Sequence, residues 1–155
     1  MSDNLISQKF EHISAMISNT PMLEIRFLYK EKPYRIFAKA EYYNLTGSIK
    51  DRVAYYILKK AYENGTIHPG DVIAEATSGN TGISFSAMGS YLGHPVIIYM
   101  PDWMSRERIN LMKSYGAQVR LVSREEGGFL GSIAMTEKLE QGGGVFLPRQ
   151  FSNED

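Results

Sequence analysis

The sequence contains no cysteine among its 155 residues, which excludes disulfides, thiolate metal sites and thiol nucleophiles. It also lacks an excess of either charge, because 17 Lys and Arg balance 17 Asp and Glu. Nothing in the overall charge therefore attracts the chain to nucleic acid or to an anionic membrane. No apolar run approaches the roughly 18 residues of a membrane-spanning helix. The first ten residues lack the basic start and apolar stretch of a secretion signal, so we expect a cytoplasmic protein.

Histidine is also scarce. The three histidines do not have the spacing of a metal site, and the sequence shows neither a Ser–His–Asp arrangement nor a pair of catalytic carboxylates. We therefore predict no bound metal, and we look for the chemistry of the chain in its lysines and its glycine-rich loops.

The pattern of apolar residues predicts one compact α/β domain. An amphipathic helix over 4–18 is followed by two strands, 22–30 and 34–40, with a turn at 31–33. From there, helices and short apolar strands alternate. Helices are predicted over 48–63, 80–92, 105–115 and 128–140, and strands over 71–76, 95–100, 117–122 and 145–148.

Alternating strands and helices favour right-handed βαβ units, and thus a parallel sheet with helices on both faces. The strands are almost continuously apolar, as is typical of strands covered on both sides. Ligands of such sheets bind beyond the carboxyl ends of the strands. The loops after residues 40, 76, 100, 122 and 147 are therefore the candidate positions for a site.

The helix that begins near residue 48 carries a lysine in its first turn. Ser48 is the predicted N-cap and Asp51 completes a capping-box pattern. The apolar face is predicted to run through Ile49, Val53, Ile57 and Ala61, which recur every four residues.

Lys50 has two interpretations. As a surface residue, its ammonium bends into water, because a cation at a helix N-terminus costs about 0.3–1 kcal/mol. Alternatively, the position serves to keep the amine neutral, since a positive helix end and burial both lower an ammonium pKa. A lysine of this second kind could form a Schiff base with a carbonyl cofactor.

The run Thr77-Ser78-Gly79-Asn80-Thr81-Gly82 lies between a predicted strand and a predicted helix. Its composition suits an ordinary loop capped by Asn80 or Thr81, and it equally suits an anion site made of hydroxyls and free N–H groups. The sequence contains neither a P-loop nor a G-x-G-x-x-G pattern, so a carboxylate is a better candidate than a nucleotide.

Three further features lie near the same edge of the sheet. The glycines of residues 127–131 favour close packing over ligand binding, and Trp103 favours partial packing over a role as an aromatic wall. Gln150 follows the last strand, where its side chain could reach the site unless it belongs to a polar tail.

Taken together and in this order, these segments resemble the N-terminal half of the cysteine synthase (O-acetylserine sulfhydrylase) branch of fold type II pyridoxal-phosphate enzymes. The resemblance extends from Thr20-Pro21 to about Asn153. Its anchors are TGSIKDR (46–52), EATSGNTGI (75–83), MPDWMSRER (100–108), YGAQV (115–119) and QFSN (150–153). The resemblance implies the three-layer fold of the tryptophan synthase β-subunit, with only about half of that fold present.

The resemblance also implies residue roles. Lys50 would carry pyridoxal 5'-phosphate as a Schiff base, and Asn80 would hydrogen-bond the ring hydroxyl oxygen of the cofactor. The remaining implied site residues bind the α-carboxylate of an amino-acid substrate, and they are Thr77, Ser78, Thr81 and Gln150.

The implied reaction is β-elimination followed by β-replacement on a serine- or cysteine-type amino acid, a transferase or lyase activity of cysteine biosynthesis. Freed Lys50 would remove the α-proton, the β-substituent would leave, and sulfide or another nucleophile would add. A threonine or serine dehydratase is the runner-up, and a non-catalytic half-domain is the alternative from another class. Cysteine lyase, lanthionine synthase and cystathionine synthase activities share the same motifs.

The sequence departs from the family pattern in three places and in length. Leu45-Thr46 and Ala76 replace the usual prolines, and Glu154-Asp155 replaces a proline-containing continuation. Family members are roughly twice as long, and the glycine/threonine loop for the cofactor phosphate belongs to their second half. We therefore expect a truncated chain that binds the cofactor weakly, turns over poorly, and associates as a homodimer or with a complementary C-terminal half.

The resemblance divides the chain into three parts. Residues 1–45 would form a helix and strands that pack on the absent larger domain, with their apolar faces exposed. Residues 46–147 would form the small α/β domain, and residues 148–155 would start the return to the larger domain.

Overall fold

A computed structural model describes residues 3–153, so the departure at Glu154 and Asp155 lies outside the described residues. The helices are α1 (Asp3–Ala15), α2 (Lys50–Glu63), α3 (Asn80–Leu92), α4 (Arg106–Ser114) and α5 (Gly128–Glu140), with a 3-10 turn at Glu41–Tyr43. The strands are β1 (Met22–Tyr29), β2 (Lys32–Lys39), β3 (Val72–Ala76), β4 (Val96–Pro101), β5 (Gln118–Val122) and β6 (Val145–Phe146). Each predicted element is present, with bounds shifted by at most three residues.

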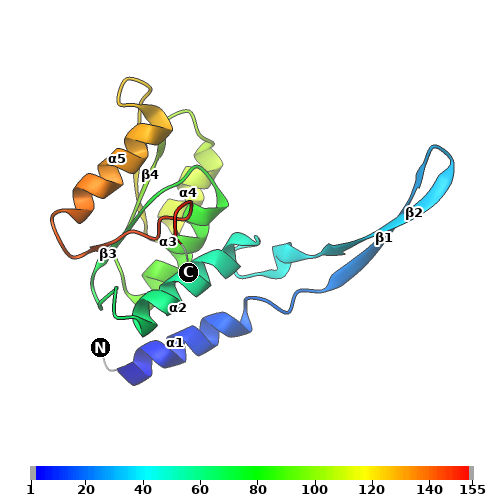
Figure 1. The fold of residues 1–155 in the computed structure, drawn as a ribbon, viewed down its shortest axis with the longest axis horizontal. Coiled ribbons are helices and arrows are strands. Elements are labelled where there is room, and N and C mark those ends of the chain that lie inside the picture. The colour runs from blue at the N-terminus through cyan, green and yellow to red at the C-terminus, as the bar shows by residue number, and fades with distance from the viewer. Residues whose placement is uncertain (1–2, 154–155) are drawn as a thin grey trace.

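Strands β3 to β6 form a parallel sheet in the order β5-β4-β3-β6. Helix α5 covers one face of this sheet, while α3 and α4 cover the other (Figure 1). Helix α2 packs against α3, and α1 lies along α2 and α3 (Figure 1). The predicted α/β class, a parallel sheet with helices on both faces, is confirmed.

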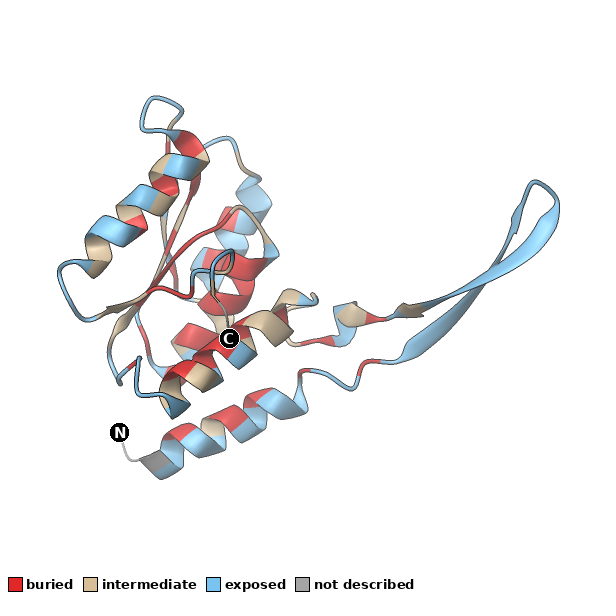
Figure 2. Ribbon diagram, in the orientation of Figure 1, coloured by how far each residue is buried: buried red, intermediate tan, exposed pale blue. Residues whose placement is uncertain are grey.

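The core lies between the sheet and the α3 layer, where burial is most complete (Figure 2). Phe85 and Met88 of α3 and Ile73 and Ile98 of the sheet are fully buried. Helix α3 is buried nearly all round, as its composition predicts, because it lies between the sheet and α2. Burial of each such side chain stabilises the fold by about 1.5–3 kcal/mol.

Strands β1 and β2 form an antiparallel hairpin that extends away from the rest of the molecule (Figure 1). Lys30 and Glu31 connect the strands with φ angles of 48° and 62°, the left-handed conformation of a two-residue hairpin turn. The predicted turn at 31–33 is therefore one residue late, and Pro33 belongs to β2. Both faces of the hairpin are exposed (Figure 2).

The apolar residues of the first 45 positions differ in exposure. The hairpin exposes Phe37 by 60% and Leu28 by 74%, as expected for a segment without a partner. Helix α1 does not follow this expectation, because Phe10 and Ile13 are buried against the α2 and α3 layer. The exposed apolar surface of this part of the chain is thus concentrated in the hairpin.

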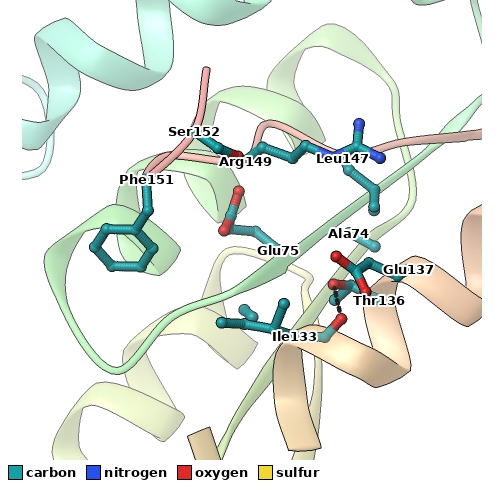
Figure 3. A pocket seen from close by; sticks show the side chains of 10 residues that line it. Ala74, Glu75, Ile133, Thr136, Glu137, Leu147, Arg149, Phe151 and Ser152 are labelled. Carbon is teal, nitrogen blue, oxygen red and sulfur yellow. Dashed lines mark hydrogen bonds between the residues drawn. The ribbon is translucent and has the colours of Figure 1, made fainter. Parts of the chain in front are cut away.

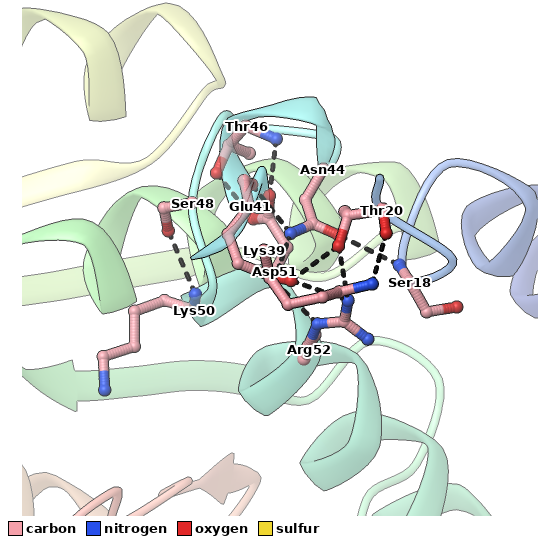
Figure 4. A network of polar contacts seen from close by, with 10 residues as sticks. All are labelled: Ser18, Thr20, Lys39, Glu41, Asn44, Thr46, Ser48, Lys50, Asp51 and Arg52. Carbon is pink, nitrogen blue, oxygen red and sulfur yellow. Dashed lines mark hydrogen bonds and ion pairs between the residues drawn. The ribbon is translucent and has the colours of Figure 1, made fainter. Parts of the chain in front are cut away.

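A polar network attaches the base of the hairpin to α2 (Figure 4). Arg52 Nε donates to Glu41 Oε2 at 2.7 Å, and Thr20 Oγ1 donates to Glu41 Oε1 at 2.7 Å. The Asn44 amide donates to the same carboxylate and accepts the Ser18 N–H. The Arg52 guanidinium and these hydrogen bonds lower the pKa of Glu41 from 4.5 to about 2.

The buried face of α2 differs from the predicted one by about one position. Ile57 and Ala61 are buried as predicted, but their buried neighbours are Ala54 and Leu58, and Ile49 is 55% exposed. The reason is that α2 begins only at Lys50, so Ile49 precedes the helix and does not follow its periodicity.

Candidate active site

Lys50 is the first residue of α2, and its side chain is half-buried. The predicted N-cap, Ser48, lies one residue too early, because Ile49 occupies the cap position and has no side-chain hydrogen bond to the helix. Ser48 Oγ instead accepts the main-chain N–H of Lys50 at 3.0 Å. The Lys50 amine points away from the polar network at the base of the hairpin (Figure 4).

The predicted capping box is also wrong, because Asp51 turns inward. Its carboxylate is fully buried and accepts the main-chain N–H of Thr46 at 2.7 Å and the Thr46 hydroxyl. The hydroxyl of Ser84 on α3 donates to Asp51 Oδ1 at 2.7 Å. A buried carboxylate needs several donors, and these partners satisfy it where a single cap N–H could not.

The same contacts join the starts of α2 and α3. Ser84 Oγ lies 3.0 Å from the carbonyl oxygen of Asn80, the first residue of α3. Asp51 directly follows Lys50, so one hydroxyl links the residue next to the lysine to the residue that opens α3. Hydrogen bonds therefore join the two helix starts that carry Lys50 and Asn80.

The loop between β3 and α3 presents the predicted small polar residues. Thr77 and Thr81 are buried, Ser78 is half-buried and Asn80 is exposed. Gly79 occupies the cap position of α3, and no side chain caps the helix. The proposed caps, Asn80 and Thr81, are thus not used as caps. Within residues 3–153, the N–H groups of Asn80 and Thr81 donate to no main-chain oxygen, so they remain available to an anion.

Close packing of this loop depends on Gly82. A Cβ atom at this position would lie 2.7 Å from Thr77 Cγ2 and 3.0 Å from Met112 Cε. Glycine therefore allows the first turn of α3 to lie directly against Thr77, which holds the threonine side chain in place.

Gln150 reaches the same loop from the other end of the chain. Its Nε2 donates to the carbonyl oxygen of Ala76 at 3.4 Å, directly before Thr77. Arg108 of α4 donates to the carbonyl oxygen of Ser78 at 3.3 Å, a contact that the sequence analysis missed. Helix α4 carries two arginines, and nothing in the sequence distinguishes Arg108 from Arg106.

The fold therefore places the six predicted residues at neighbouring positions. One group, at the carboxyl end of β3, comprises Thr77, Ser78, Thr81 and Gln150. The other pair, Lys50 and Asn80, lies on the joined helix starts of α2 and α3. Both groups occur at the edge of the sheet where ligands of parallel sheets bind.

The glycines of residues 127–131 serve packing, as favoured from the sequence. A Cβ atom on Gly131 would lie 2.0 Å from the Glu126 carbonyl oxygen, so only glycine fits at this close approach. Trp103 packs against Gly128 and under the Arg124 guanidinium, and it remains 47% exposed.

Glu75 is the most unusual side chain near the site, and the sequence analysis did not single it out. It lies in β3 directly before Ala76, is only 5% exposed, and lines a cavity of about 90 Å³ between β3, α5 and the segment after β6 (Figure 3). Burial raises the pKa of its carboxyl from 4.5 to about 7. A glutamate within an otherwise apolar strand was the available signal.

Residues 3–153 contain neither a metal-binding cluster nor a membrane-spanning helix. No group of three His, Cys, Asp or Glu side chains in this range is placed to hold a metal ion. None of the helices described there is both long and apolar enough to cross a membrane.

The model of the family described as pyridoxal-phosphate dependent enzyme matches residues 13–155. A probable cysteine synthase of Bacillus subtilis is 42% identical over 139 residues, which cover 89% of this chain and 44% of that protein. The chain therefore spans less than half the length of the curated relatives that it matches.

Solved structures agree with this family. A hydrogen sulfide-producing enzyme from Fusobacterium nucleatum is 59% identical with a TM-score of 0.91, over 95% of this chain and 44% of that one. A mutant of the same enzyme has been solved with an α-aminoacrylate intermediate. A cysteine synthase from Entamoeba histolytica is 37% identical with a TM-score of 0.81, over 91% of this chain and 43% of that one.

The family match covers nearly the whole chain, and the parallel sheet and its flanking helices coincide with those of solved relatives. The cofactor of these enzymes is pyridoxal phosphate, and their fold is fold type II. The chain belongs to the pyridoxal-phosphate dependent enzyme family and corresponds to the N-terminal portion of its cysteine synthase relatives.

Proposed function

We propose that this chain supplies the lysine-bearing part of an enzyme that performs β-elimination and β-replacement on serine- or cysteine-type amino acids. The observation that carries the proposal is the junction of α2 and α3, where Asp51 and Ser84 fasten the helix start that bears Lys50 to the uncapped start of α3. A covalent cofactor and the carboxylate of a substrate need such neighbouring positions.

The residues present fit pyridoxal phosphate at its reactive end. Lys50 is a half-buried amine at a helix start, where it could bond to the aldehyde of the cofactor, and Asn80 is exposed on the adjacent helix start to bond its ring hydroxyl oxygen. When bound, the cofactor supplies an electron sink for the charge that develops at the α-carbon of the substrate.

The remaining chemistry belongs to side chains of this chain. We propose that Thr77, Ser78 and Thr81, together with the open N–H groups of α3, hold the substrate carboxylate, and that Gln150 closes over it. With the carboxylate fixed, the Lys50 amine would remove the α-proton as a general base once the amine of the substrate has replaced it on the cofactor. Loss of the β-substituent follows, which agrees with the α-aminoacrylate complex described for the Fusobacterium enzyme.

We also propose that the hairpin packs against polypeptide that corresponds to the unmatched part of the relatives. That part is more than half of the Bacillus protein, of which this chain covers 44%. The hairpin exposes Phe27, Ile36 and Phe37 by 41–60%, and apolar surface of this kind on a protein marks an interaction site. Association as a homodimer is the other arrangement that such a surface permits. Activity of the 155 residues alone is therefore expected to be low.

The test is covalent trapping. The chain is incubated with pyridoxal phosphate, reduced with borohydride and digested, and the modified peptide is identified by mass spectrometry. We expect the adduct on Lys50 in the wild type and its loss in Lys50→Ala, while the matched control Lys59→Ala, an exposed lysine on the same helix, keeps it. An adduct distributed over several lysines, or unchanged in Lys50→Ala, would contradict the proposal.

The substrate class has its own test. Added polypeptide that corresponds to the unmatched part of the relatives should raise the release of sulfide from L-cysteine, and it should not raise product formation from a control substrate. The control substrate is L-threonine, which a dehydratase would convert to 2-oxobutyrate. Preference for threonine would favour the dehydratase alternative.

A further inference from the structure

Strand β6 has two residues, whereas its neighbour β3 has five. Val145 and Phe146 pair with Val72 and Ile73, and two further residues in this register would place Pro148 opposite Glu75. Proline has no N–H to donate to a sheet, so the ladder cannot continue through this position. The next residue, Arg149, has a φ of 51°, and its carbonyl oxygen accepts the N–H groups of Ser152 and Asn153. The chain therefore turns out of the sheet.

This turn leaves two peptide N–H groups without the partners that a strand would supply. Within residues 3–153, neither Arg149 nor Gln150 donates its N–H to a main-chain oxygen. The Glu75 carboxyl points toward this segment (Figure 3). Glu75 and Arg149 line the same cavity. Burial raises the pKa of the Glu75 carboxyl, and the main-chain N–H groups of Gln150, Arg149 and Ala76 act in the opposite direction.

Glu75 is poorly satisfied for a buried group. Its Oε2 is inaccessible to solvent and has no hydrogen-bond partner among residues 3–153. The Arg149 guanidinium donates to Glu140 at 2.6 Å, so it acts on Glu75 through its charge and not through a hydrogen bond. The other charged residue that lines the cavity is Glu137 on α5, which repels a carboxylate. An unpartnered buried polar atom costs about 1–3 kcal/mol, so a role that offsets this cost is expected.

The position of the turn gives that role. Gln150 follows the turn directly, and its amide already contacts the Ala76 carbonyl oxygen, between Glu75 and Thr77. If the Glu75 carboxyl accepts the peptide N–H groups of Arg149 and Gln150, it fixes the main chain at Gln150. The position of the Gln150 side chain relative to the loop of Thr77 is then fixed as well.

We propose that Glu75 is a positioning residue that replaces the broken ladder of β6 and holds Gln150 over the carboxylate of the amino-acid substrate. This inference rests on the proposed function for the identity of the ligand, but the contact itself does not depend on it. Glu75 does not touch the reacting atoms and acts only through the segment that carries Gln150.

The first experiment uses no ligand, so failure of the proposed function does not affect it. Amide hydrogen exchange of the full 155-residue chain is followed by NMR in Glu75→Ala, in Glu75→Gln and in Glu137→Gln, which lines the same cavity from α5. We expect the amides of Arg149 and Gln150 to exchange at least about tenfold faster in Glu75→Ala, because the proposed carboxyl acceptor is removed. Glu75→Gln keeps an acceptor oxygen and should retain part of the protection.

Two measurements show whether the variants keep their fold. Glu137→Gln should exchange like the wild type, and the amide of Ile98 in β4 should be unchanged in every variant. Unchanged exchange of Arg149 and Gln150 in Glu75→Ala would overturn the proposal. So would an equal increase in Glu137→Gln, because it would assign the effect to the cavity and not to the Glu75 carboxyl.

The second experiment connects this contact to the ligand. The chain is loaded with pyridoxal phosphate and titrated with L-serine, and the side-chain amide resonance of Gln150 is followed. We expect the half-saturating concentration to rise about tenfold in Glu75→Ala, less in Glu75→Gln and not in Glu137→Gln. Faster exchange with an unchanged half-saturating concentration would overturn the positioning role. If the wild type shows no serine response although the exchange result holds, the proposed function fails and the contact stands.

Discussion

The hairpin and the parallel sheet are built from the same kinds of residue but have opposite surroundings. Phe37 in β2 is 60% exposed, whereas Phe85 on α3 is fully buried against the sheet. Glu41 at the base of the hairpin has a lowered pKa because an arginine pairs with it, whereas Glu75 in β3 has a raised pKa because it is buried. Local sequence thus sets which elements form, and partners distant in sequence decide what each residue contributes.

The phenylalanines should show the largest difference. Phe85→Ala removes a fully buried ring and should lower the free energy of unfolding by about 3–5 kcal/mol. Phe37→Ala should change it by no more than about 0.5 kcal/mol, because the ring is largely in water already. Urea denaturation followed by circular dichroism measures both. A comparable loss in the two variants would show that the hairpin is covered in solution, for instance by a second copy of the chain.

Glu75 should give the next largest effect, and only above about pH 4.5. Its folded pKa of about 7 exceeds the ordinary 4.5, so the folded state binds more protons between these values. The stability that this provides is present below pH 4.5 and is lost as the pH rises through 7. Relative to wild type, Glu75→Gln should gain up to about 3 kcal/mol between pH 4.5 and pH 8. A pH-independent difference between the two proteins would contradict this.

Glu41 should behave in the opposite direction and with the smallest effect on stability. Its folded pKa of about 2 lies below 4.5, so its contribution is present above pH 4.5 and is lost as the pH falls toward 2. The carboxyl and the Arg52 guanidinium are both partly exposed, so solvent screens the pair. NMR titration of the side-chain carboxyl should show a midpoint near 2 in the wild type and a higher midpoint in Arg52→Ala, which stays below the ordinary 4.5 because Thr20 and Asn44 still donate to the carboxylate. A wild-type midpoint near 4.5 would mean that the pair is not formed in solution.

The same contrast explains which parts of the structure the sequence predicts. The elements follow from periodicity and turn residues, because these signals are local. Examples are the helix of residues 80–92 and the glycine-rich segment after β5. Ser48 and Asp51 also match the local pattern of a capping box. Asp51 nevertheless lies in the interior, where it accepts a hydrogen bond from Ser84, 33 residues away. The role of Glu75 depends on Pro148 and Arg149, which lie more than seventy residues further along the chain, so no local pattern could reveal it.

The bond between Asp51 and Ser84 has a mechanical consequence. Because it joins the starts of two packed helices, it fixes the position of Lys50 relative to the first turn of α3. The segment after β6 crosses the edge of the sheet without ladder bonds to β3, so its main chain is held by fewer hydrogen bonds than the two helix starts.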